Sequence, residues 1–116
     1  MSQYRLTQAA EADFIHILRA SKQDFGLEAA RRYKALISLA LKDISENPAL
    51  TGMRPFEQNV QLYHLRHSAK RATLENNKVK RPRHFIAYKH DALTNVIDII
   101  RILHDAMDLE QHISQD

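Results

Sequence analysis

The first half of the chain places apolar residues three and four positions apart, which is the spacing of a helix that buries one face. The first such run extends to Phe25 and carries acidic residues in its first turns, where the helix dipole favours them. Thr7 precedes the run, and its hydroxyl can accept a hydrogen bond from a free amide of the first turn. The pattern therefore predicts a short strand at residues 4–6 and then a helix from Thr7 to Gly26.

A second helical run has the clearest periodicity in the chain. It begins near Leu27 and keeps its spacing for about four turns. Asn47 and Pro48 end it, because proline has no amide to continue the helix and pushes the preceding residue out of helical geometry. Two helices joined at a glycine form an antiparallel hairpin. The residues expected to pack between this hairpin and a sheet are Phe14, Ile17, Leu18, Tyr33, Leu36, Ile37, Ala40 and Ile44.

The second half of the chain changes to the alternation of period two that is typical of strands. Residues 60–66 alternate apolar and polar side chains and predict a half-buried strand, with Tyr63 on the polar phase. Residues 49–59 contain glycine and proline and are expected to form a loop. The polar, basic stretch 68–82 is expected to be a long hairpin connection.

Two further strands are predicted at residues 85–88 and 96–103, where β-branched and aromatic residues flank a turn at 90–95. They should pair as antiparallel neighbours. The resulting order, β-α-α-β-β-β with a short C-terminal tail, is an α+β fold in which a helical hairpin packs on a small antiparallel sheet. At 116 residues the chain has the size of one domain, so we assign residues 1–116 to a single domain.

The composition excludes several kinds of site. There is no cysteine, so the chain has no disulfide, no thiolate ligand for a metal and no nucleophilic thiol. No run approaches the ~20 apolar residues that a membrane span needs. The N-terminal stretch also lacks the apolar core of a signal peptide. We expect a cytoplasmic protein that does not interact with membranes.

Charge is distributed unevenly along the chain, although the net charge is only +3. From Arg66 to Lys89 there are eight basic residues and one acidic residue, Glu75. From Asp91 onward, six acidic residues accompany Arg101 alone. A basic region of this kind suits an anionic partner, either nucleic acid or an acidic protein segment, unless it is simply a solvated hairpin tip.

Several short segments together resemble the RelE/ParE toxin superfamily, and most closely its ParE type. They are the stop at Glu46-Asn47-Pro48, the Tyr63-His-Leu-Arg strand, the aromatic-ended strand from Phe85 to Tyr88, and the segment Asp98-Ile-Ile-Arg-Ile-Leu-His-Asp-Ala-Met-Asp. The last of these is the most specific. The resemblance spans nearly the whole chain, and the basic stretch between the second and third strands departs from the shortest members.

The resemblance implies the toxin of a type II toxin-antitoxin module, a class linked to plasmid stabilisation and growth inhibition. A ParE-type toxin is expected to inhibit DNA gyrase by binding it, without a cofactor. Its implied partner is a cognate antitoxin, a ParD-like ribbon-helix-helix protein whose acidic disordered tail wraps the toxin. DNA is then expected to be contacted only through the antitoxin complex. The chain could also be an inactive relative of these toxins that only binds its antitoxin.

A RelE-type toxin would instead cut mRNA in the ribosome, and the resemblance implies basic residues for that chemistry. They would orient the attacking hydroxyl and neutralise charge on the phosphorane. The matching positions here are His64, Arg66 and Arg83. Phe85 and Asp105 stand at two positions where such an enzyme would have arginine, and no tyrosine follows in the tail. We therefore expect the ParE-type activity, with mRNA cleavage as the alternative.

Five residues are the expected contacts to the target or the antitoxin: Arg66, Arg81, Arg83, Arg101 and His104. Arg101 lies in an apolar strand, on the predicted face of Ile99 and Leu103. It would need either a partner surface or an internal ion pair with Asp98, Asp105 or Asp108. His104 could form an acid-base pair with a carboxylate, but a role in capping and orienting the tail is favoured.

Two other groupings of side chains could carry chemistry. Four histidines on or near the predicted strands could approach one another, but their spacing matches no metal motif, so no metal site is expected. Three aromatic residues could stack on nucleic-acid bases if exposed, although aromatic residues in strands more often form the core. The histidines are His64, His67, His84 and His90, and the aromatic residues are Tyr63, Phe85 and Tyr88.

Overall fold

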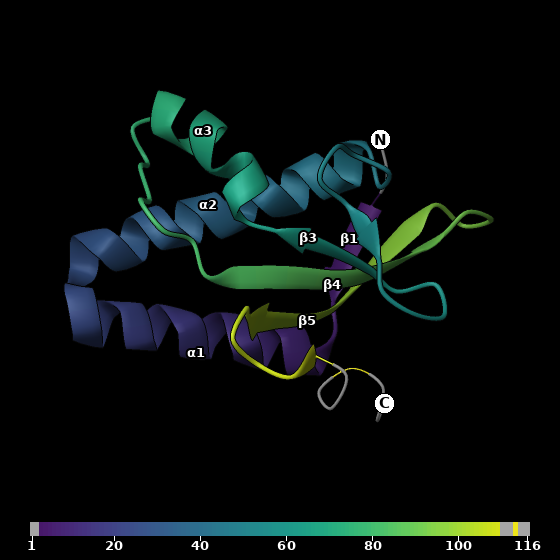
Figure 1. The fold of residues 1–116 in the computed structure, drawn as a ribbon, viewed down its shortest axis with the longest axis horizontal. Helices are drawn as coiled ribbons and strands as arrows, with labels where there is room; N and C mark the ends of the chain where they lie inside the picture. Colours follow the sequence, from purple (N-terminus) through teal and green to yellow (C-terminus); the bar gives the residue numbers. More distant parts are fainter. Residues whose placement is uncertain (1–2, 110–112, 114–116) are drawn as a thin grey trace.

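The computed structural model describes residues 3–109 and 113. Along the chain, the elements are β1 (Gln3–Leu6), α1 (Gln8–Phe25), α2 (Leu27–Glu46), β2 (Arg54–Pro55), β3 (Gln61–His64), α3 (Arg66–Leu74), β4 (His84–Asp91) and β5 (Val96–His104). Figure 1 shows α1 and α2 as an antiparallel hairpin, with α3 beside α2. None of the helices in the described ranges is both long and apolar enough to span a membrane.

The ends of the two long helices lie where the sequence predicts them. The Thr7 hydroxyl accepts a hydrogen bond from the amide of Ala10 at 3.1 Å, as expected of an N-cap. Gly26 separates α1 from α2 and has a φ of +97°, a backbone conformation that residues with a side chain rarely adopt. Asn47 is the C-cap of α2. The predicted helical hairpin is confirmed.

The sheet is mixed, whereas the sequence predicted a purely antiparallel one. Its strand order is β1-β5-β4-β3-β2. β1 pairs with β5 in parallel, and the other neighbours are antiparallel. After β1 the chain passes through both helices before it returns to the sheet, so β1 can lie beside the last strand. β2, a two-residue strand within the predicted loop 49–59, forms the opposite edge.

The stretch 68–82 contains a helix, which corrects the prediction of a hairpin connection without regular structure. α3 begins at Arg66, and the preceding strand ends at His64. The inward side of α3 holds a buried polar contact: the Ser68 hydroxyl donates to Asp43 of α2 at 2.7 Å and lies 2.8 Å from the Tyr63 hydroxyl. This tertiary contact fixes a helix whose own sequence is mostly polar.

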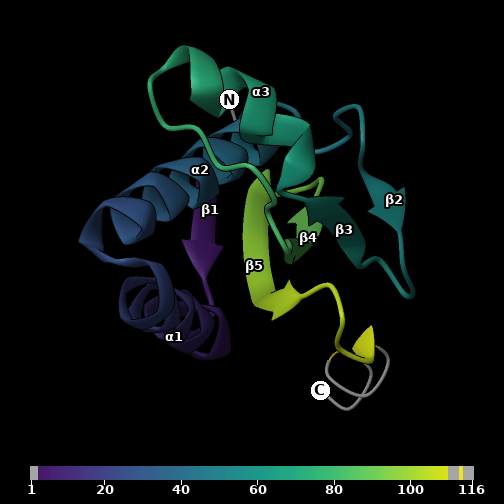
Figure 2. The same cartoon turned by 60° about the vertical axis from the view of Figure 1, so that its left-hand side comes forward.

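Apolar residues pack on both faces of the sheet. The larger cluster lies between the sheet and the helices and includes Leu36, Ile37, Ile86 and Ile99, all with no exposed surface. The smaller cluster lies on the other face and is closed by Leu109 and Ile113, which follow β5. In Figure 2 the helical hairpin lies on one side of the sheet, and the segment after β5 lies on the other.

Strand β3 is consequently buried on both faces rather than on one. Leu62 belongs to the smaller cluster and Tyr63 to the larger one, and they are only 1% and 2% exposed. The prediction of a half-buried strand is therefore wrong. A tyrosine can occupy the core when its hydroxyl has a partner, which Ser68 provides here.

Candidate functional site

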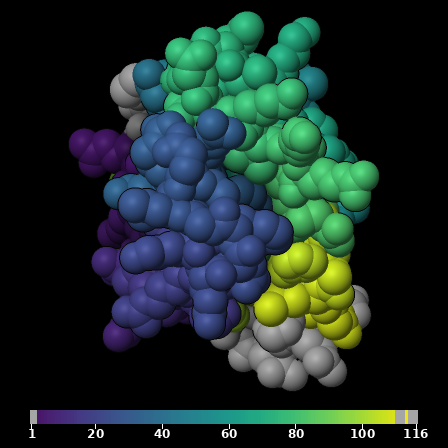
Figure 3. Space-filling view, turned by 90° about the vertical axis from the view of Figure 1, so that its left-hand side faces the viewer, coloured from purple at the N-terminus to yellow at the C-terminus, as the bar shows by residue number. Residues whose placement is uncertain are grey.

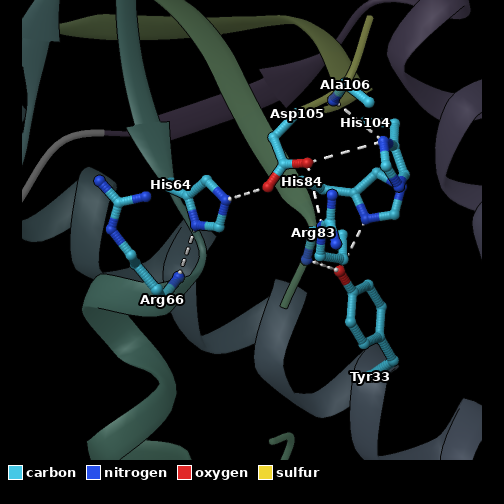
Figure 4. Close-up of polar contacts among 8 residues, drawn as sticks. All are labelled: Tyr33, His64, Arg66, Arg83, His84, His104, Asp105 and Ala106. Carbon is cyan, nitrogen blue, oxygen red and sulfur yellow. Dashed lines mark hydrogen bonds and ion pairs between the residues drawn. The ribbon is translucent and has the colours of Figure 1, made fainter. Parts of the chain in front are cut away.

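A cluster of polar side chains forms where the ends of β3 and β5 meet the start of β4. Figure 4 shows Asp105 at its centre, with His64 on one side and Arg83 on another. Asp105 directly follows β5, and its amide donates to the carbonyl of Arg83 at 2.8 Å. His64 is paired with Phe85 in the register of β3 and β4. Sheet pairing thus assembles residues that lie far apart in the sequence.

The Asp105 carboxylate binds two of the basic side chains that the sequence analysis singled out. Its two oxygens accept hydrogen bonds from His64 Nε2 at 3.0 Å and from Arg83 Nε at 3.1 Å. Burial by itself would raise the pKa of Asp105, but these two hydrogen bonds outweigh it and keep that pKa below its ordinary value. Asp105 is therefore a charged carboxylate at neutral pH and neutralises cationic groups around it.

The protonation pattern of His64 follows from its neighbours. Its Nδ1 accepts the amide of Arg66 at 3.0 Å, and a backbone amide can only donate. The ring proton of neutral His64 therefore lies on Nε2, which faces Asp105. The side chain is only 3% exposed. His64 serves here as a fixed donor to an internal carboxylate, out of reach of solvent.

His84 and Tyr33 form a second pair within the cluster. The Tyr33 hydroxyl lies 2.6 Å from His84 Nδ1, and its oxygen accepts the amide of Arg83 at 3.0 Å. Burial, helped by the nearby His104, lowers the pKa of His84 to about 4. Burial also raises the pKa of Tyr33 to about 12. Both groups are therefore neutral at physiological pH.

His104 orients the segment after β5, as the sequence analysis favoured. Its Nδ1 accepts the amide of Ala106 at 3.0 Å. Its ring packs edge-on against His84, with 5.3 Å between the ring centroids. Asp105 lies beside it, with 3.7 Å from His104 Nδ1 to the carboxylate. The contacts tie the tail to the sheet.

Beside this cluster, a groove of about 1190 Å³ runs between the helical hairpin and the segments 78–83 and 102–107. In Figure 3 the hairpin occupies the left of the view, with segment 78–83 in green and the residues near 105 in yellow to its right. The lining of the groove includes apolar side chains, a basic edge formed mainly by segment 78–83, and two carboxylates, Asp13 and Asp24. The apolar residues are Ile17, Ala20, Phe25, Ala29, Val79, Ile102, Leu103, Ala106 and Met107, and the basic ones are Arg32, Lys78, Lys80, Arg81 and Arg83.

Arg101 forms an internal ion pair, but with a different partner from those expected. Its Nε and Nη2 donate to the Asp13 carboxylate of α1 at 2.8 and 3.0 Å. The same carboxylate accepts the amide of Ile102 at 2.9 Å. The expectation of a pair within its own segment, with Asp98, Asp105 or Asp108, is wrong.

The predicted face of Arg101 is also wrong, because β5 contains a bulge. Ala87 pairs with Arg101, and the next residue of β4 pairs with Ile99, so Ile100 is an extra residue in the strand. The bulge shifts the alternation of side chains. Ile99 therefore belongs to the cluster under the helices, whereas Leu103 belongs to the opposite cluster.

The remaining predicted residues fall into three groups. Arg66 and Arg81 are exposed, and Arg81 lies at the rim of the groove. Of the aromatic residues, Tyr63 and Tyr88 are in the core. Phe85 is partly buried and lies 5.2 Å under the guanidinium of Arg54, so within the described chain these rings already have partners.

The four histidines do not converge. His67 packs beside Tyr63, and His90 lies 2.9 Å from the side chain of Asn95. Within residues 3–109 and 113, no three His, Cys, Asp or Glu side chains are arranged to hold a metal ion.

The sequence did not indicate the roles of two residues, Tyr33 in the cluster and Asp13 in the ion pair with Arg101. The spacing of Tyr33 predicts a core residue and does not reveal the contacts of its hydroxyl. Asp13 is one of the acidic residues in the first turns of the first predicted helix, where its position suggests only an interaction with the helix dipole. The sequence contained one weak indication of the role of Asp13. Arg101 is a single cation in an apolar strand, so it needs a carboxylate from another part of the fold.

Comparison with solved structures identifies the class of fold. The chain is similar to a chain of the chromosomal ParDE toxin-antitoxin system from P. aeruginosa, with a TM-score of 0.66 and 19% identity over 90% of this chain and 96% of that one. It is also similar to a chain of the RelBE2 toxin-antitoxin complex from Mycobacterium tuberculosis, with a TM-score of 0.54 and 19% identity over 89% and 96% of the two chains. The α+β fold with a helical hairpin is thus that of ParE/RelE toxins.

The sequence identifies the family. Residues 4–109 match the family described as the ParE toxin of the type II toxin-antitoxin system parDE, so the chain belongs to the ParE toxin family. A search of curated protein sequences found no match.

Proposed function

We propose that this toxin inhibits DNA gyrase by binding it, without covalent chemistry, and that a cognate antitoxin neutralises it. Membership of the ParE family favours this function over mRNA cleavage. The observation that carries the proposal is the environment of Asp105. The carboxylate binds His64 and Arg83, two of the three basic residues that an RNA-cleaving relative would use.

The chemistry of that cluster supports binding over catalysis. A carboxylate in contact with these two side chains repels a phosphate, and a histidine that is 3% exposed cannot reach a ribose hydroxyl. Arg66 is exposed and could still contact RNA. One remaining cation does not supply the base, the acid and the charge stabilisation that phosphodiester cleavage needs.

The test uses purified full-length toxin in a gyrase supercoiling assay, with an mRNA cleavage assay in a translation extract run in parallel. We expect inhibited supercoiling or trapped cleaved DNA, together with intact mRNA. Codon-specific cleavage that is lost in Arg66→Ala and Arg83→Ala would establish the RelE-type activity instead. Normal growth on confirmed soluble expression, with neither effect in vitro, would indicate an inactive relative.

The groove is the surface we assign to the antitoxin. Its apolar wall and basic rim suit an amphipathic acidic segment, such as the tail of a ParD-like protein. Ala20→Arg would fill the groove with a bulky cation, and we expect it to weaken neutralisation by the antitoxin. Arg19→Ala, on the neighbouring exposed position of α1, is the control. The neighbouring reading frame, co-expressed, supplies the antitoxin for a growth-rescue assay.

A further inference from the structure

A second basic surface lies outside the polar cluster around Asp105. It consists of five cationic residues: Arg66 and Lys70 of α3, outside the groove, and Lys78, Lys80 and Arg81 of the following segment, which also line the groove. All five are exposed. None of them forms an ion pair with a carboxylate among residues 3–109, whereas Arg71 and Arg83 in the same part of the chain do. We call this set the α3 basic surface.

The fold holds α3 rigidly in place. Ser68 and Ala72, both 1% exposed, face the interior. Tyr63, Ser68 and Asp43 form a hydrogen-bonded chain from β3 through α3 to α2, and Arg71 forms an ion pair with the same Asp43 carboxylate. A buried polar chain of this kind has one geometry in which every group is satisfied. The outward side of α3 is therefore presented in a fixed orientation.

Arg66 and Lys70 lie four residues apart on α3, so they are neighbours on its outward side. In Figure 4 the Arg66 side chain extends away from Asp105. Its guanidinium is thus not part of the neutralised cluster. Lys78, Lys80 and Arg81 extend the positive charge along the segment that returns to β4.

We infer that the α3 basic surface binds the phosphate backbone of duplex DNA, so that the toxin contacts DNA itself and not only through its antitoxin complex. Duplex DNA carries one charge per about 1.7 Å, and cations on an exposed helix can bind it without an apolar pocket. An acidic protein segment has less charge per length and relies on apolar contacts as well, which the groove offers and the outward side of α3 does not. We take this DNA to be the segment held by gyrase, and this part of the inference rests on the proposed function.

The experiment measures binding of full-length toxin to a short fluorescent duplex of mixed sequence, without gyrase, over a range of salt concentrations. We expect a Kd of roughly 10⁻⁴ to 10⁻⁶ M at physiological salt. If each of the five cations neutralises one phosphate, the slope of log affinity against log salt is about −4.5. The double variant Arg66→Ala/Lys70→Ala should reduce the magnitude of that slope by about 1.8.

The matched control is Arg19→Ala/Lys22→Ala, which removes the same charge from exposed positions of α1 and should leave the slope unchanged. Circular dichroism verifies that both double variants are folded. Absence of DNA binding, or equal losses in the two double variants, overturns the inference. Binding of a polyglutamate as tight as that of DNA also overturns it in favour of an acidic protein partner.

The two proposals can fail separately. A toxin that inhibits gyrase but does not bind free DNA refutes the DNA contact and leaves the proposed function standing. A toxin that binds DNA through α3 but leaves gyrase active refutes the proposed function alone.

Discussion

Acidification should destabilise the folded protein through His84, whose ring packs between Tyr33 and His104. In the unfolded chain a histidine takes up a proton near pH 6.5. In the folded protein the pKa of His84 is lowered to about 4, mainly by burial and then by His104. Between these two values the unfolded state binds more protons, so stability is full above about pH 6.5 and falls as the pH decreases towards 4.

The size of the effect follows from the two pKa values. A difference of about 2.5 in pKa corresponds to about 3.4 kcal/mol of unfolding free energy at full protonation. The His84 ring is partly exposed, and solvent screens part of this penalty. We therefore expect a loss of about 2 to 3 kcal/mol between pH 7 and pH 4 from this residue.

The measurement is urea unfolding followed by circular dichroism at a series of pH values, for the wild type and for His84→Asn. The asparagine oxygen can accept the Tyr33 hydroxyl but does not titrate, so the variant should lose that part of the pH dependence. The difference between the two curves isolates His84 from the other titrating groups. Parallel curves from pH 7 to pH 4 would refute burial of a neutral imidazole as the cause.

Tyr33→Phe is the matched control. It removes the hydroxyl that bonds to His84 and to the amide of Arg83, and should cost about 1 to 3 kcal/mol at every pH, because that amide loses its acceptor. It leaves the ring in place, so the additional loss of stability in acid should persist. If this variant abolished the acid sensitivity, the hydrogen bond rather than burial would determine the pKa of His84.

Two further substitutions test how the fold is held together, each by the change in unfolding free energy. Asp13→Ala removes the carboxylate that binds Arg101 and a backbone amide of β5, and should lower the unfolding free energy by about 3 kcal/mol. Asp98→Ala removes an exposed ion pair and should lower it by less than about 1 kcal/mol. Equal costs would contradict the importance of the contact between α1 and β5. Gly52→Ala forces a side chain onto a φ of +98° and places its Cβ 2.6 Å from the His67 ring, so we expect a loss of about 1 to 3 kcal/mol. Adding His67→Ala should recover only the steric part, and full recovery would exclude backbone strain.

The helical hairpin and the family could be predicted from the sequence because both depend on patterns within short segments. A helix repeats its spacing over many residues, and its ends at Thr7, Gly26 and Asn47 depend on chemistry within one turn. The resemblance to ParE toxins also lay in short segments, and the family match over residues 4–109 confirms it. None of these features needed knowledge of which distant residues meet.

The candidate site was only partly predictable. The sequence identified His64 and Arg83 as candidate site residues and has Asp105 at a position where an RNA-cleaving relative would have arginine. It did not predict that the three side chains bind one another, because they come from different segments brought together by the pairing of β3, β4 and β5. The role of the Tyr33 hydroxyl could not be predicted either, because its partners also come from a distant segment of the chain.

The errors were in features that long-range contacts decide. A polar stretch forms α3 because Asp43 of α2 offers a partner for Ser68, and an expected antiparallel sheet gains a parallel edge because β1 lies beside β5. The bulge at Ile100 changes which face each later side chain of β5 occupies. The sequence alone determined the helices, their ends and the family. Only the tertiary structure decided the sheet order, the third helix and the partners of the buried charges, because a charge in the interior binds whichever opposite group the packing places beside it.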